Sequence, residues 1–150
     1  MNNVKDQMIL FIVMFFVGIL FNPMNVLAYN VKHIYLSYTL IYSGLLMASN
    51  MIWSHQIVHY LQMGHFNINI FIVGILMSFV ISMFLLRGQL FIGKKEWLKR
   101  MIGHHSTALT TTKKLLKSKK DIKKLPNIYG LAKDIIYNQE REIMFMESYL

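Results

Sequence analysis

Three long apolar stretches occupy the first 86 residues of the chain. The first extends from Gln7 to about Ala28, the second from about Ile34 to Leu61, and the third from Ile68 to Leu86. A helix needs roughly 20 mostly apolar residues to cross a lipid bilayer. The pattern therefore predicts three transmembrane helices, joined by the low-charge segment Asn22–Lys32, expected as a short interfacial loop, and by the polar turn Gln62–Asn67.

The rest of the chain shows the period of amphipathic helices. Two apolar seams follow a spacing of three and four residues: Leu98, Met101, His105, Ala108, Thr112 and Leu115, then Ala132, Ile136, Gln139, Ile143, Met146 and Leu150. Pro126 suits the first turn of the second helix, where its missing N–H is harmless. We therefore expect an all-α protein with a transmembrane domain at 1–86 and an antiparallel helical hairpin at 87–150 that turns near Ile122.

Charge divides the chain at the same place. Residues 1–86 carry a net charge of +1, whereas residues 87–150 hold 14 Lys or Arg against 6 Asp or Glu, a net charge of +8. The 54 positions from His33 to Leu86 contain no Asp, Glu, Lys or Arg. A soluble domain needs charged residues to cover its surface, so an ordinary soluble enzyme is excluded. The lack of cysteine also excludes disulfides and thiolate metal sites.

The first apolar stretch has a second interpretation as a secretory signal. Its core, Met8–Phe21, has a suitable length, and Val26-Leu27-Ala28 resembles a cleavage site. Asp6 beside Lys5 is atypical of a signal, so we expect an uncleaved anchor.

Basic residues in the flanking segments predict an orientation, because Lys and Arg concentrate on the cytoplasmic side of membrane spans. Five of them follow the third apolar stretch: Arg87, Lys94, Lys95, Lys99 and Arg100. Lys5 stands alone before the first stretch and Lys32 between the first and second. This distribution places the C-terminal half in the cytoplasm and the N-terminus outside.

The second apolar stretch carries a stripe of His and Met at every fourth position: Met47, Met51, His55, His59 and Met63. Such positions lie close together on one helix face, and ionisable residues inside a membrane are often functional. Met51, His55 and His59 are therefore candidates for an intramembrane site. The alternative is that the histidines are neutral and bond to neighbouring spans, with methionine as apolar filler.

A second candidate site lies in the hairpin. Folding about residue 122 places His105 opposite Gln139 and Met101 opposite Ile143. One layer then gathers the possible ligands Met101, His104, His105, Glu142 and Met146, with Gln139 as an orienting neighbour. Imidazole and thioether groups suit Cu(I), so the layer predicts a copper site. The alternative is a hydrogen-bonded polar layer that holds no ion.

The same residues carry a resemblance to a known family. The run Met101-Ile102-Gly103-His104-His105-Ser106-Thr107-Ala108, followed by Leu131-Ala132, Ile135-Ile136, Gln139, Glu142-Ile143 and Met146, resembles domain of unknown function 305 over about residues 93–150. The part before it is similar to membrane-anchored members with three spans. The resemblance implies a ferritin-like hairpin that forms a four-helix bundle with a second copy, binds copper or silver, and lies outside the cytoplasm, against the charge argument.

Other functions are less consistent with the sequence. A di-iron oxidase would need several inward carboxylates and Glu-x-x-His pairs, which the hairpin lacks, so we do not expect an enzyme. Seven lysines surround the hairpin turn: Lys113, Lys114, Lys117, Lys119, Lys120, Lys123 and Lys124. They could contact anionic lipid or a partner, or only keep the turn soluble. Nucleic acid is an unlikely partner because no aromatic residues are interleaved for base stacking.

Overall fold

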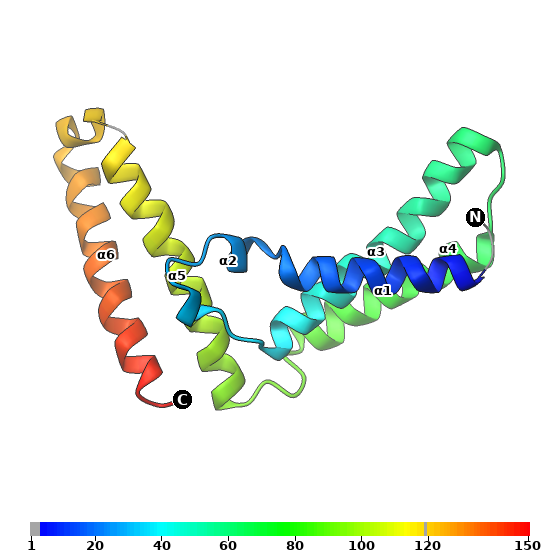
Figure 1. Cartoon of the computed structure of the whole chain (residues 1–150), viewed down its shortest axis with the longest axis horizontal. Coiled ribbons are helices and arrows are strands. Elements are labelled where there is room, and N and C mark those ends of the chain that lie inside the picture. The colour runs from blue at the N-terminus through cyan, green and yellow to red at the C-terminus, as the bar shows by residue number, and fades with distance from the viewer. Residues whose placement is uncertain (1–3, 119) are drawn as a thin grey trace. The chain divides into compact units, whose positions relative to one another are not determined.

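The structure, a computed structural model, describes residues 4–118 and 120–150, and every regular element in that part of the chain is a helix (Figure 1). This confirms the all-α prediction. The α-helices are α1 (Val4–Leu20), α2 (Pro23–Val26), α3 (Tyr38–Met63), α4 (Ile68–Val80), α5 (Lys94–Ser118) and α6 (Pro126–Glu147). Short 3₁₀ segments occupy Val31–His33 and Lys120–Lys124, and a π-helical stretch, Ile81–Arg87, continues α4.

The helices form two compact units. Unit 1 consists of the chain up to Asn22 together with Tyr38–Ile92, and unit 2 consists of Pro23–Ser37 together with Gly93–Leu150. We call Pro23–Ser37 the connector. The expected hairpin domain therefore contains an additional segment from between the first two apolar stretches.

In unit 1, α3 packs against both α1 and α4. Glycines allow the close approach of these helices. A Cβ on Gly44 would lie 2.8 Å from the Ile19 side chain and 3.0 Å from the Phe15 carbonyl oxygen of α1. A Cβ on Gly74 would lie 3.0 Å from the Trp53 backbone of α3. The central position of α3 lets it bury polar side chains, among them Ser49 and Gln56, which are fully buried.

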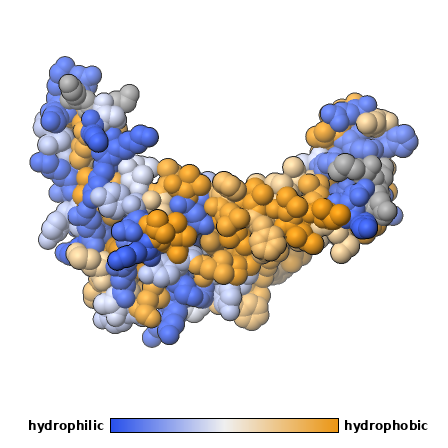
Figure 2. Space-filling model, viewed as in Figure 1, coloured by the Kyte–Doolittle hydropathy of each residue, from blue (hydrophilic) through white to orange (hydrophobic). Residues whose placement is uncertain are grey.

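Two helical segments are long and apolar enough to cross a membrane: Val4–Val26, which covers α1 and α2, and Ile68–Arg87, which covers α4 and the π-helical stretch. They agree with the first and third predicted spans. The second, α3, does not reach this level of hydropathy, because Ser, Asn, Gln and His side chains interrupt it. Figure 2 shows apolar side chains covering the exposed surface of α1 and mostly hydrophilic ones covering the hairpin of α5 and α6.

In unit 2, α5 and α6 run antiparallel, as expected (Figure 1). Their shared core consists of Ile102, Leu109, Ile143 and Met146. Pro126 lies in the first turn of α6, and Ile122 is buried in the 3₁₀ turn between the helices. Two helices with a turn that contains Ile122 between them agree with the predicted hairpin.

The connector packs on α5, a contact that the predicted short interfacial loop at Asn22–Lys32 did not include. It contacts a stretch of α5 with small side chains, Gly103 and Ser106, which lets the connector backbone come close. The Tyr29 backbone N–H donates to the Ser106 hydroxyl oxygen at 2.7 Å. The Ser106 side chain is fully buried as a result.

Candidate metal centre

His105 lies at the centre of the predicted metal layer, and contacts hold both of its ring nitrogens. Nδ1 lies 2.7 Å from the Met101 carbonyl oxygen one turn earlier, and Nε2 lies 2.8 Å from Glu142 Oε2 on α6. A carbonyl oxygen only accepts hydrogen bonds, so Nδ1 carries a proton. Metal-binding histidines use this arrangement, in which one N–H is held by a backbone carbonyl and the other nitrogen faces the ion.

The pairing across the hairpin differs from the prediction by about one turn. His105 bonds to Glu142, three residues beyond its expected partner Gln139. Gln139 is half-buried on the same helix. His104 is exposed on the flank of α5, with its ring edge-on to that of His105 and the centroids 5.9 Å apart. The structure therefore brings His105 and Glu142 together and leaves His104 accessible beside them.

The two methionines of the layer lie on its apolar side. Met146 is buried in the core with Ile102 and Ile143, and Met101 is partly buried against that core. Both methionine side chains therefore pack in or against the apolar core of the hairpin. No group of three or more His, Cys, Asp or Glu side chains within 4–118 and 120–150 lies close enough to hold an ion as the side chains stand.

The connector forms a second histidine–carboxylate pair on unit 2, which the sequence did not reveal. His33 Nδ1 lies 2.9 Å from Ser106 Oγ, and His33 Nε2 lies 3.6 Å from Glu147 Oε1. The Ser106 Oγ, which accepts the Tyr29 N–H, thus also forms the hydrogen bond with His33 Nδ1. The signal available in the sequence was the run of small residues on α5.

The lysines of the hairpin turn differ in their surroundings. Lys113 bonds to Glu140 Oε1 at 2.5 Å, and its Nζ lies 4.1 Å from the centre of the Tyr29 ring. The Glu140 hydrogen bond, supported by Tyr29, raises the pKa of Lys113 against a smaller opposing effect of burial. Lys124 pairs with Asp121 at 2.9 Å.

The other predicted contact lysines are exposed where the structure describes them: Lys114, Lys117 and Lys123. Lys119 and the side chain of Lys120 lie outside the described residues. Lys113 is therefore engaged within unit 2, and three of the described lysines present their side chains to the surroundings.

The His and Met stripe of α3 lies partly against α1. His55 Nδ1 lies 3.3 Å from Gln7 Nε2, and a Cβ on Gly18 would lie 3.1 Å from the Met47 sulfur. His59 instead contacts the turn after α3 through the His65 carbonyl oxygen. Met51 is partly exposed.

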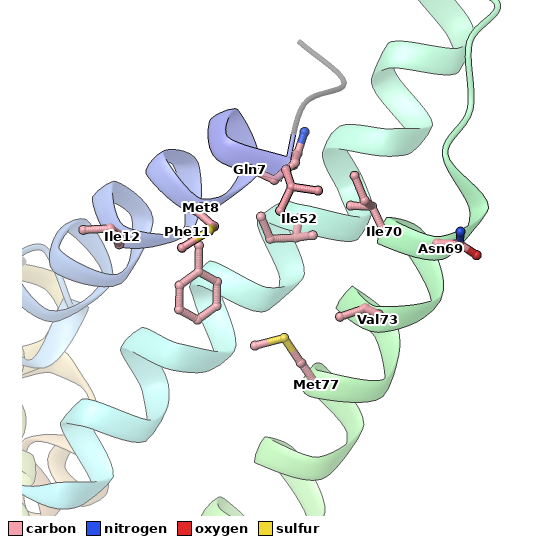
Figure 3. Close-up of a pocket in the computed structure, with 10 residues that line it drawn as sticks. Gln7, Met8, Phe11, Ile12, Ile52, Asn69, Ile70, Val73 and Met77 are labelled. Carbon is pink, nitrogen blue, oxygen red and sulfur yellow. The ribbon is translucent and has the colours of Figure 1, made fainter.

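An apolar groove of about 440 Å³ lies between α1 and α4, with Ile52 of α3 at its base. Figure 3 shows Phe11 of α1 and Met77 of α4 lining it, with the polar Gln7 and Asn69 toward one end.

Comparison with known proteins agrees with the sequence pattern of the hairpin. The family model described as Domain of unknown function (DUF305) matches residues 88–150. The whole chain is 34% identical over 150 residues to an uncharacterized protein of Acanthamoeba polyphaga mimivirus, of which it covers 93%. No solved structure matches the chain. The chain therefore belongs to the DUF305 family, and its α5–α6 hairpin lies within the matched region.

Proposed function

We propose that the protein crosses a membrane three times and binds copper through the hairpin of unit 2. The surface of α1 and α4 supports the membrane part. In the most apolar 18 residues of each segment, only 6% are buried for Val4–Val26 and 11% for Ile68–Arg87. The core helix of a soluble protein would be mostly buried, so these helices do not have that role. Contiguous apolar surface on this scale is typical of lipid contact.

The two chain segments that make up unit 2 support α3 as the third span. The connector precedes α3, and the rest of unit 2 follows α4, yet both pack into one unit. If α4 crossed the membrane and α3 did not, these two segments would lie on opposite sides. An even number of crossings between Ser37 and Gly93 is therefore needed, and α3 with α4 provides two.

The length and place of α3 fit this role. Its 26 residues extend about 39 Å at 1.5 Å per residue, enough for a hydrocarbon core of about 30 Å. Polar residues in membrane helices face other helices, and Ser49 of α3 lies 3.1 Å from Ser78 of α4, oxygen to oxygen. The polar character of α3 thus follows from its place between two lipid-facing helices.

Unit 2 then lies on a single side, which we propose to be the cytoplasm. The connector contributes Lys32, and the segment after α4 contributes Arg87 and the four basic residues between Lys94 and Arg100. The opposite side has Lys5, and the α3–α4 turn has no basic residue. This distribution follows the positive-inside pattern.

The His105 geometry is the observation that carries the copper proposal. With Nδ1–H held by the Met101 carbonyl, Nε2 is the proposed ligand atom; it shares a proton with Glu142 at 2.8 Å, and the ion would take the place of that proton. His104 and the Met101 thioether are the nearest groups to complete the site. Rotation of Met101 away from the core would supply the soft sulfur ligand that Cu(I) prefers.

A second copy of the hairpin is the proposed partner. One hairpin offers few ligands, and α6 leaves Leu131, Met144 and Phe145 exposed, each by at least 59%. Pairing two hairpins into a four-helix bundle would cover such residues and bring a second His104 and His105 into reach. We therefore expect a homodimer.

Copper content of the purified full chain under reducing conditions tests this function. Replacing both histidines, His104→Ala and His105→Ala, should lower the copper stoichiometry by at least one ion per pair of hairpins while helicity survives. Asn138→Ala, an exposed change on α6, is the matched control and should leave copper unchanged. Binding should also weaken in acid, because a protonated imidazole has no lone pair for the ion.

Two results would contradict the copper proposal. One is a wild-type chain that binds no copper under these conditions. The other is a double-histidine variant with the wild-type copper content, which would make the His105–Glu142 pair a structural hydrogen bond.

A further inference from the structure

Three histidines lie near the end of α3 and in the turn toward α4. His55 and His59 are half-buried on the last three turns of α3, and His65 is exposed in the turn that follows. Figure 1 shows the path of the chain from α3 to α4. The ring centroids of His55 and His59 are 6.1 Å apart, and those of His59 and His65 are 6.4 Å apart. The cluster belongs to unit 1 and shares no residue with the copper site proposed on unit 2.

Backbone hydrogen bonds define the protonation of two of these rings. His59 Nδ1 lies 3.0 Å from the His65 carbonyl oxygen, and His65 Nδ1 lies 2.8 Å from the Met63 carbonyl oxygen. Carbonyl oxygens only accept, so both rings carry a proton on Nδ1. In the neutral form, each ring then has a lone pair on Nε2, the atom that would bind a metal.

A buried amide orients the third ring. Gln7 is 5% exposed, and its side-chain amide faces His55 Nδ1 at 3.3 Å. The atom that faces the ring is Gln7 Nε2, which donates, so His55 Nδ1 accepts and the ring proton lies on Nε2. A half-turn of the amide would bring its oxygen to the ring, move the proton to Nδ1 and leave Nε2 as a ligand atom.

We propose that His55, His59 and His65 bind a divalent transition-metal ion, such as Zn²⁺, through their Nε2 atoms. Imidazole suits such ions, and three protein ligands leave a fourth position for water. Metal–nitrogen bonds of about 2.0 Å place the ring centroids of a tetrahedral site roughly 5 Å apart. The His55–His59 and His59–His65 pairs are each about 1 Å further apart than this, and the three rings as they stand do not hold an ion. The proposed site therefore closes by rotation of the side chains, led by the exposed His65.

The competing interpretation is that these rings only cap the end of α3. The carbonyl of Met63 belongs to the last turn of the helix, where carbonyls lack helical partners. Capping needs the Nδ1 protons alone, whereas metal binding needs the three Nε2 atoms at once. Metal binding that depends on all three rings therefore separates the two interpretations.

The test uses the full chain with His104→Ala and His105→Ala, so that the hairpin site is absent. Zn²⁺ and Co²⁺ are the probes, followed by calorimetry and by the visible bands of tetrahedral Co²⁺. We expect one ion per chain. His65→Ala should weaken binding at least tenfold and remove the Co²⁺ bands, and the neighbouring exposed change Gln62→Ala should alter neither.

A further variant guards against an effect of His65→Ala on the turn itself. Gln7→Ala leaves the turn intact and removes only the group that orients His55, so Zn²⁺ affinity should fall about tenfold, as for other residues that orient metal ligands. The proposal is wrong if the background chain binds neither ion, or if binding persists unchanged in both His65→Ala and Gln7→Ala. Either result is independent of the copper proposal, because this test uses a chain without His104 and His105. Copper binding by unit 2 is measured separately on the wild-type chain.

Discussion

Ser106 joins the connector to α5 through one buried oxygen. Its Oγ accepts the Tyr29 N–H at 2.7 Å and is hydrogen-bonded to His33 Nδ1 at 2.9 Å. His33 in turn reaches Glu147 near the end of α6. One hydroxyl therefore links the connector and both hairpin helices, and it lies on the residue next to His105.

Removal of this hydroxyl should loosen the connector. In Ser106→Ala, the Tyr29 N–H and His33 Nδ1 lose a buried partner, which costs about 1–3 kcal/mol. We expect a lower unfolding temperature of the full chain and faster amide hydrogen exchange at Tyr29. The same substitution at the exposed Ser118 should change neither. Equal exchange at Tyr29 in both variants would show that the hydroxyl does not hold the connector.

At the scale of the helices, the crossing of α1 and α3 depends on the absence of side chains. Gly44 faces Ile19 and the Phe15 carbonyl at distances where a Cβ does not fit. Gly130, within α6, has no atom within 4 Å of its Cβ position. The two glycines thus give opposite expectations for the same substitution.

Gly44→Ala should destabilise the chain, because the α1–α3 contact must open to admit the methyl group. Gly130→Ala should instead stabilise it by up to about 1 kcal/mol, because alanine has the higher helix propensity. Thermal unfolding of both variants in detergent measures the difference. A stabilising Gly44→Ala would mean that α1 and α3 do not cross closely at this point.

The hairpin was predictable because its signals are local. Apolar periodicity defined both helices, and Pro126 marked the start of the second one. The partner of His105 could not be predicted from the turn alone. The reversal formed by the 3₁₀ segment Lys120–Lys124 and Leu125 is centred half a residue after Ile122, which shifts the opposite position by one residue. Glu142, which bonds to His105, lies three residues beyond Gln139.

The connector could not be predicted in the same way. Its contact with α5 joins residues 77 apart, from a backbone N–H of Tyr29 to a hydroxyl of Ser106. Backbone groups are the same at every position, so no residue pattern identifies such a bond. For the same reason, the bonds of His59 and His65 to backbone carbonyls could not be predicted. The stripe on the second apolar stretch indicated His55 and His59 but did not include His65.

At the scale of the whole molecule, the two units differ in the surface that they present. Unit 1 presents apolar side chains on α1 and α4, whereas unit 2 carries most of the charge. Because the connector and the α5–α6 hairpin pack together, the order of crossings is constrained. The N-terminus and the α3–α4 turn should lie on one side of the membrane, and all of unit 2 on the other.

Cysteine labelling of intact cells with a membrane-impermeant maleimide tests this central claim most directly, since the chain has no cysteine of its own. Single cysteines replace three exposed residues: Val31 in the connector, Asn127 in α6 and Gln62 before the α3–α4 turn. We expect labelling of Gln62→Cys in intact cells, and of Val31→Cys and Asn127→Cys only after permeabilisation. Labelling that places Val31 and Asn127 on opposite sides, or all three positions on one side, would contradict the three-span account.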